Sequence, residues 1–475
     1  MSADRLVSEV HLSSTRFDDR VEGLIQSTVW LLPVLFILSP KIQIVGPAFR
    51  LGDVLAGVLI VCHLWLSVRR REFKLEWIGW IYVLLRLSAV ASIAWGYSAL
   101  HIPPNIRDVF ELPKLVIFYL TFRVARSASW TARDVRKVGW SVILASLPVF
   151  VLSVYQYVDV PGVNDHISPL FASPWHVMKI LSIGRAVGTF GNPNYLAFFL
   201  IAPTLIIFAF LAGKFPESPR DTRGIWGAVV YLLFLAAAFG LASSRTALVA
   251  IAAAVGACAF LAVRVAVDPP KISGALRSVL QSLVVVSVVL MIGINAVQYL
   301  PSAANSMGLL ERLEVGYDEV REGGDGSYTN FAQRLERWGI AVDEISESPV
   351  FGRGPAKEMV ETLDLEPTDN EYLYHAARYG ILGLMFYLML YVGMFVSTWR
   401  LSRKSTIMQL TGDRALALVM FGMVFSALLF GIMAGTFYNL QIWPMMMFGY
   451  GMLLGYAQDW DDPAIATLRD GAADA

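Results

Sequence analysis

The stretch "GRAVGTFGNPNYLAFF", residues 184–199, decides the fold, because it joins a glycine-rich polar turn to a long apolar run. Arg185 and an Asn-Pro-Asn sequence stand directly before that run. Proline is common in the first turn of a helix, so Pro193 predicts a helix start, and Asn192 or Asn194 can cap it. The stretch predicts a membrane-spanning helix that is entered through a polar, tightly turned segment.

The composition of the whole chain agrees with a membrane protein. Of its 475 residues, 56% are hydrophobic and 16% are charged, whereas a soluble domain has about 25% charged residues. Apolar stretches near the length of a membrane span recur along the chain. The formal net charge of zero excludes a global basic field for nucleic acid. These features predict an all-α polytopic membrane protein that does not bind nucleic acid.

Hydropathy predicts about twelve transmembrane helices. Their approximate bounds are 25–40, 51–68, 77–97, 108–125, 138–158, 193–213, 225–242, 246–266, 276–299, 373–399, 413–434 and 440–457. With a cytoplasmic N-terminus, the cytoplasmic short loops hold nineteen Lys or Arg residues and the outer short loops hold six. Because cytoplasmic loops carry the excess of cations, both termini are expected on the cytoplasmic side of the membrane.

The expected organisation follows from these spans. A cytoplasmic segment over 1–24 precedes nine helices over 25–300, and a large loop on the outer face over 301–372 precedes three helices over 373–457. An acidic cytoplasmic tail covers 458–475. Residues 301–368 of the loop carry fourteen Asp or Glu and six Arg or Lys. Within them, "NFAQRLERWGIAVDEI" has apolar residues at helical spacing, which predicts an amphipathic helix at the mouth of the bundle.

Four arginines are expected on the outer side, where a charged residue at membrane depth suggests a function. Arg185 precedes the sixth span, Arg245 lies in the very short turn between the seventh and eighth, and Arg334 and Arg337 lie on the amphipathic loop helix. Guanidinium groups bind phosphate through paired donors and stay charged, so converging arginines resemble an anion clamp. A single arginine at a helix end is also a common interfacial anchor, and both interpretations stay open.

"PTDNEYLYHAARYG", residues 367–380, places Asp369, Asn370 and Glu371 just before the tenth span. A carboxylate at this level could act as a general base, and it could equally be a helix N-cap. Asp369 is the candidate base, while Asn370 and Glu371 join Asn194, Arg334 and Arg337 as candidate substrate-binding residues. No nucleotide-binding loop, dinucleotide fingerprint or Cys/His metal spacing occurs, so no cofactor and no metal are predicted.

The order of these motifs resembles the O-antigen ligase and O-antigen polymerase superfamily of bacterial inner-membrane proteins. The carrying residues are "RAVGTFGNPN" before a span, "SSRTA" between two spans, then "RLERW", "PVFGRG", "DNEYL" and "YGILG". The resemblance implies twelve spans with a C-type glycosyltransferase architecture and a periplasmic loop between the ninth and tenth. It also implies an undecaprenyl-diphosphate-linked glycan as donor, without metal or nucleotide sugar, and a diphosphate gripped by Arg185 and Arg245.

One motif departs from the ligase pattern. Ligases that load lipid A core usually carry His-Asn where this sequence has Asp369-Asn370. The leading hypothesis is therefore an inverting polymerase of lipid-linked repeat units for O-antigen, capsule or exopolysaccharide. A ligase acting on lipid A core or protein is the alternative, and a lipid or solute transporter is a less favoured one. The expected partners are the lipid-linked glycan, the bilayer and, as a candidate, a polysaccharide chain-length regulator.

Overall fold

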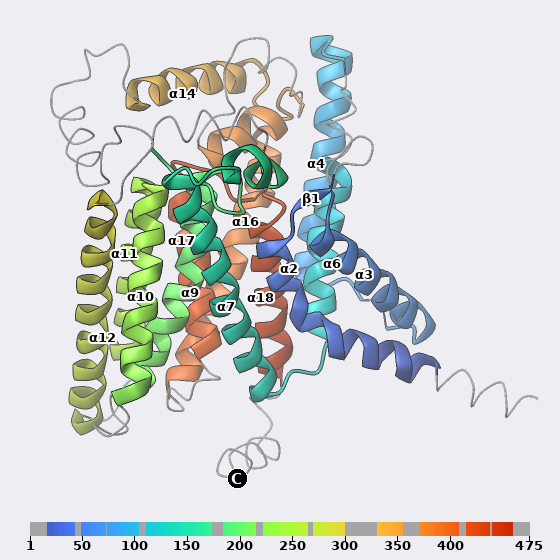
Figure 1. Cartoon of the computed structure of the whole chain (residues 1–475). Coiled ribbons are helices and arrows are strands. Elements are labelled where there is room, and N and C mark those ends of the chain that lie inside the picture. The colour runs from blue at the N-terminus through green and yellow to red at the C-terminus, as the bar shows by residue number, and fades with distance from the viewer. Residues whose placement is uncertain are drawn as a thin grey trace, which may run out of the picture.

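The computed structural model describes residues 17–42, 49–72, 74–103, 111–172, 184–214, 222–264, 269–299, 330–354, 370–407, 415–437 and 439–458. These residues form an all-helical bundle with one short antiparallel hairpin (Figure 1). The helices and strands in chain order are η1 Val29–Leu31, α2 Leu32–Leu38, β1 Lys41–Ile42, β2 Phe49–Arg50, α3 Leu51–Arg69, α4 Trp77–Leu100, α6 Glu111–Ser127, α7 Ala132–Tyr157, η2 Val163–Ile167, η3 Ser168–Leu170, α9 Pro193–Lys214, α10 Thr222–Ala242, α11 Arg245–Arg264, α12 Pro269–Ala296, η4 Val297–Tyr299, α14 Asn330–Glu347, α16 Glu371–Ile407, α17 Ala415–Phe430 and α18 Ile442–Ala457.

Nine helices among the described residues are long and apolar enough to cross a membrane. They are Phe17–Leu38, Leu51–Arg69, Trp77–Leu100, Ala132–Tyr157, Pro193–Ala212, Gly224–Ala242, Arg245–Ala262, Val279–Ala296 and Glu371–Arg403. The other three expected spans are also helical, but α6, α17 and α18 are shorter, with 17, 16 and 16 residues. The polytopic all-α fold class is confirmed.

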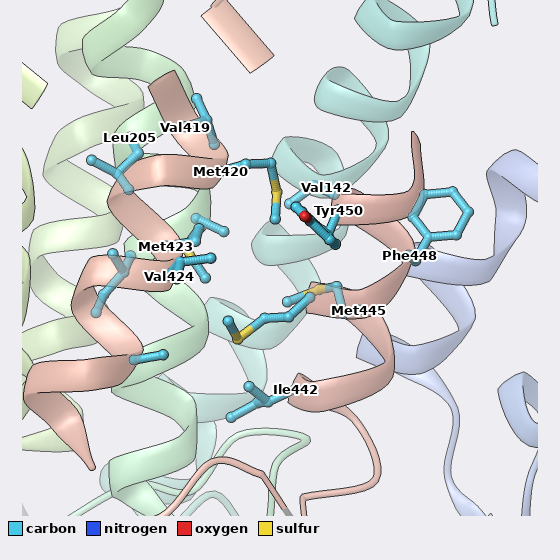
Figure 2. Close-up of a cluster of buried hydrophobic side chains, with 14 of the residues drawn as sticks. Val142, Leu205, Val419, Met420, Met423, Val424, Ile442, Met445, Phe448 and Tyr450 are labelled. Atoms are coloured by element: carbon cyan, nitrogen blue, oxygen red, sulfur yellow. The ribbon is translucent and has the colours of Figure 1, made fainter. Parts of the chain in front are cut away.

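The centre of the bundle is apolar and is built around α9, α17 and α18. In α9, 83% of the span lies inside the protein, whereas most other spans expose half or more of their length. Figure 2 shows Met420 and Met423 of α17 facing Met445 of α18, with Leu205 of α9 and Val142 of α7 beside them. All five side chains are buried. Because methionine is unbranched and adaptable, it fills the space between short helices that cross closely.

Helix α16 is broken near its beginning, at Gly380, where φ is 66° and ψ is −173°. The segment 349–354 packs into this break. The N–H of Arg353 donates to the carbonyl of Ala377 at 3.0 Å, and the N–H of Gly354 donates to the carbonyl of Arg378 at 3.0 Å. Polar backbone groups inside a membrane need partners within the protein, and this segment supplies them.

Helix α14 lies across one end of the bundle (Figure 1). It forms where the sequence predicted an amphipathic helix, and it packs against α16. Ala341 is buried and Arg334, Arg337 and Trp338 are half-buried, while Leu335 on the other side of the helix is exposed. The two arginines of α14 therefore lie toward its packed side.

Candidate active site

The glycine-rich turn before α9 is shaped by left-handed backbone conformations. Gly184, Gly188 and Gly191 have φ values of 64°, 54° and 69°. A Cβ at Gly188 would lie 3.0 Å from the Ser153 hydroxyl, and a Cβ at Gly191 would lie 2.9 Å from the carbonyl oxygen of Phe171. Glycine is needed here because only it combines a positive φ with such close packing. The sequence predicted the sharp turn. In the structure, the atoms that pack closely against its glycines belong to other parts of the protein.

The two asparagines of this turn have different partners. The side-chain oxygen of Asn192 accepts from the N–H of Asn194 at 2.8 Å, and the carbonyl of Asn192 accepts from the N–H of Leu196 at 3.0 Å. Asn192 is therefore the N-cap of α9, which begins at Pro193 as predicted. The side chain of Asn194 is left for contacts outside the cap.

Asn194 connects the two arginine motifs. Its side-chain oxygen accepts from Nη2 of Arg185 at 3.0 Å and from the hydroxyl of Ser244 at 3.1 Å. Arg185 Nε also donates to the carbonyl of Ala242, at the end of α10, at 2.8 Å. The sequence predicted that Arg185 acts together with the motif of Arg245. The contacts of Arg185 and Asn194 with Ala242 and Ser244 place the two motifs side by side.

Arg245 is the first residue of α11 and is half-buried. The chain turns at Ser243, which has a φ of 47°, and the Ser244 hydroxyl accepts from the N–H of Ala247 at 3.4 Å as an N-cap. Because Ser244 contacts Asn194 near the start of α9, the N-termini of α9 and α11 lie close together. Each helix N-terminus carries partial positive charge. Arg185, Arg245 and these two N-termini therefore lie on neighbouring segments, and positive groups of this kind suit a phosphate group.

Buried polar side chains that the sequence analysis did not single out hold the glycine-rich turn. The Gln156 oxygen accepts from the N–H groups of Val187 and Gly188 at 3.1 and 2.8 Å. The Thr189 hydroxyl donates to the carbonyl of Ile37 at 2.7 Å, and Gln441 Nε2 donates to the Thr189 carbonyl at 3.2 Å. Gln156 could have been identified from the sequence, because it is a polar residue within the apolar run of α7.

Arg334 and Arg337 lie on α14, the helix that crosses the end of the bundle (Figure 1). Arg334 Nη1 lies 4.0 Å from Sδ of Met433, in the connection between α17 and α18. Arg337 lies one turn further along α14 and is also half-buried. Their substrate-binding role stays a prediction.

The polar residues before α16 have structural contacts. Asn370 is buried, and its side-chain oxygen accepts from the N–H groups of Tyr372 and Leu373 at 3.0 Å each, so it is the N-cap of α16. The Glu371 carboxylate accepts from the N–H groups of Thr436 and Phe437 at 3.1 and 2.6 Å. The substrate-binding roles predicted for Asn370 and Glu371 are not tested by these contacts. Asp369 lies outside the described residues.

His375 is fully buried on α16, one turn after Glu371. Its ring stacks on Tyr387 with centroids 4.0 Å apart and packs against Phe437 at 5.3 Å. Nearby, Arg378 lies over the Tyr374 ring, with 4.5 Å from Cζ to the centroid. The histidine is therefore a packed core residue. Among the residues that the structure describes, no group of three or more His, Cys, Asp or Glu could hold a metal ion.

The Glu371→Gln variant is expected to lose about 1–3 kcal/mol of stability. The side-chain amide of glutamine has only one oxygen, so its NH₂ group would face one of the two backbone N–H groups, of Thr436 and Phe437, that the carboxylate now accepts from. The carboxylate is only 3% exposed, so water cannot replace the lost bond. Thermal unfolding in detergent measures the effect. Glu336→Gln, on the exposed face of α14, is the matched control and should shift stability by less than about 0.5 kcal/mol. Equal unfolding temperatures of the Glu371→Gln variant and the unmodified protein would contradict the structural role.

The comparisons with known proteins bear on the family of the chain. No curated protein matches the chain. Residues 230–388 match the family model Wzy_C, described as O-Antigen ligase, and this range contains Arg245, Arg334, Arg337 and the first part of α16. Proteins of this family have an O-antigen ligase or polymerase type of function. Residues 230–388 thus match an O-antigen ligase family model, and this match confirms the resemblance of the chain to the O-antigen ligase and polymerase superfamily.

Proposed function

We propose that this protein is a glycosyltransferase that extends a surface polysaccharide from repeat units linked to undecaprenyl diphosphate. One observation carries the proposal: Asn194 joins Arg185 to Ser244, so two arginine motifs and two helix N-termini meet at one place. A diphosphate is the substrate group that such a site recognises best, because guanidinium groups and helix N-termini both favour phosphate oxygens.

The reaction follows from this electrostatic arrangement. A hydroxyl of the acceptor sugar attacks the anomeric carbon of the donor glycan, the new C–O bond forms, and the bond to the diphosphate oxygen breaks. Undecaprenyl diphosphate leaves with the bonding electron pair. Its negative charge grows in the transition state, so fixed arginines stabilise that state more than the ground state. A single in-line displacement inverts the anomeric configuration.

The proton of the attacking hydroxyl needs an acceptor. Asp369 is our proposed base, since it directly precedes Asn370, the cap of α16. Arg334 and Arg337 of α14 are proposed to contact the glycan, because they lie on the packed side of the helix that crosses this end of the bundle. No step in this scheme uses a metal or a nucleotide sugar.

The membrane orientation is part of the proposal. The excess of Lys and Arg in the loops at the opposite end supports a periplasmic site with both termini in the cytoplasm of the inner membrane. The donor then meets the site after its transfer across the membrane, and it already carries its activating diphosphate. A chain-length regulator is the proposed protein partner.

A ligase is the second candidate function, because the matching family model is described as O-Antigen ligase. In that case, the acceptor is lipid A core or a protein, while the donor and the arginine site are unchanged. The Asp369-Asn370 pair, where lipid A ligases of the superfamily usually carry His-Asn, favours the polymerase.

Purified protein is expected to convert a synthetic undecaprenyl-diphosphate-linked repeat unit into longer glycans in a buffer with a chelator and no nucleotide. The donor holds its own activation energy, so the products should form a ladder on a gel and in mass spectra. Addition of lipid A core separates the two candidates. A ladder without the core supports the polymerase, and transfer only to the core supports the ligase. Glycan formation that requires a nucleotide sugar would contradict both.

A further inference from the structure

A second positively charged group lies at the hairpin between α2 and α3. The Arg50 side chain is only 6% exposed, and its Nη1 atom has no hydrogen-bond partner among the described residues. Burying a guanidinium N–H donor without a hydrogen-bond partner costs free energy, since the donor loses its hydration. A buried donor of this kind is suited to bind an anionic ligand.

The charges around Arg50 add to this positive field. Lys41 is the direct cross-strand partner of Arg50 in the hairpin and is exposed. Burial lowers the pKa of Arg50 to about 10. Arg50 also stands directly before α3, a 19-residue helix whose N-terminus is partly positive.

One carboxylate faces this group. Asp53 Oδ2 accepts from the backbone N–H of Arg50 at 2.9 Å, as part of the α3 cap. Its charge attracts the guanidinium, but the described residues show no ion pair between the two side chains. Two cations and a helix N-terminus therefore stand against one carboxylate that is already engaged with the backbone.

The hairpin lies at the same end of the bundle as the arginine site. The N–H of Gly52 donates to the Ser39 hydroxyl at 3.3 Å, which ties the start of α3 to the end of α2. The end of α2 is tied to the glycine-rich turn, since Thr189 donates to the carbonyl of Ile37. Thr189 is four residues after Arg185. The two positive groups are thus separate but share one face.

We propose that Arg50 and Lys41 form a second anion site, which binds the diphosphate of the acceptor glycan lipid. This inference rests on the proposed function, in which each of two lipid-linked glycans carries its own diphosphate. A polymerase must hold both lipids at once. The site at Arg185 and Arg245 is proposed to bind the diphosphate of the donor only. The exposed Lys41 makes the first contact with the headgroup, and Arg50 supplies the buried donor.

Native mass spectrometry of the whole protein with undecaprenyl diphosphate tests the proposal by counting bound lipids. Two molecules are expected on the unmodified protein and one on the Arg50→Gln variant. Arg70→Gln, at the other end of α3, is the matched control and should keep both. The Arg185→Ala/Arg245→Ala double variant should keep one, so a failure of the proposed function is distinguished from a failure of this site.

Kinetics with separate donor and acceptor lipids give a second measurement. Arg50→Gln is expected to raise KM for the acceptor by roughly tenfold to a hundredfold, the loss of one charge-assisted hydrogen bond, without changing KM for the donor. Lys41→Gln, a surface change that folding tolerates, should raise the same KM to a smaller extent. Equal effects on both lipids would overturn the assignment to the acceptor.

Two further outcomes would overturn the proposal. If Arg50→Gln no longer folds, Arg50 is a structural residue, whereas a buried guanidinium with an unbonded donor predicts an unchanged or higher unfolding temperature. If inorganic pyrophosphate occupies the site and undecaprenyl diphosphate does not, the ligand is a free anion and not a lipid headgroup. Displacement of pyrophosphate by the lipid is the supporting result.

Discussion

The Arg245→Ala variant is expected to lose glycan transfer by roughly 10²- to 10³-fold in kcat, with little change in the amount of folded protein. Arg245 begins α11 beside the contact between Asn194 and Ser244. In the proposed reaction, its guanidinium meets charge that develops on the leaving diphosphate. Removing it therefore affects the transition state more than the binding of the donor, so kcat falls more than KM rises.

Single-turnover assays with a labelled undecaprenyl diphosphate glycan measure this effect. Arg245→Lys should recover only part of the activity, because an ammonium keeps the charge but not the paired donors. Arg277→Ala, on an exposed position of α12, is the control and should be fully active. Unchanged elongation by Arg245→Ala would show that the arginine is an interfacial anchor and would remove the diphosphate site from the proposal.

The Gly380→Ala variant is expected to lose at least about 3 kcal/mol of stability. The φ and ψ values of Gly380 are accessible almost only to glycine, and forcing another residue into such a region costs about 1–3 kcal/mol. A Cβ there would also lie 2.1 Å from the carbonyl oxygen of Val350, which displaces the segment that satisfies the helix break. The bond from the N–H of Ile381 to the carbonyl of Pro349, at 2.8 Å, would be lost with it.

Thermal unfolding and the folded fraction after detergent extraction measure this loss. Gly339→Ala is a well-matched control, because Gly339 lies within α14 and a Cβ there would meet nothing within 4 Å. Alanine favours helix by about 1 kcal/mol, so the control should be as stable as the unmodified protein or more stable. Normal unfolding of Gly380→Ala would mean that α16 can straighten without the inserted segment.

The fold class could be predicted from the sequence because it depends on local apolar runs of sufficient length. The short turn at Arg245 and the helix start at Pro193 were equally accessible, since serine, proline and asparagine have strong positional preferences at helix ends. The amphipathic helix α14 was visible in the spacing of its apolar residues. Each of these features is encoded within about twenty residues.

Features that depend on distant partners could not be predicted. Residues 373–399 read as one continuous span, yet α16 breaks at Gly380 because residues 349–354 fill the break. A glycine in an apolar run gives no sign of its φ. Similarly, the sequence could not choose between Asn192 and Asn194 as the cap, because the choice depends on the contact of Asn194 with Arg185 and Ser244.

The segment that fills the break in α16 has a consequence for engineering. Arg353 forms ion pairs with Glu344 and Glu347 of α14, while the backbone of Arg353 and Gly354 bonds to α16. The ring of Phe351 also packs against Trp95 of α4, with centroids 5.6 Å apart. The end of the outer loop is thus a structural part of three helices, and it cannot be exchanged between homologues as an independent cassette. Chimaeras designed to swap glycan specificity should keep residues 341–354 together with α16 and α4 of the same parent.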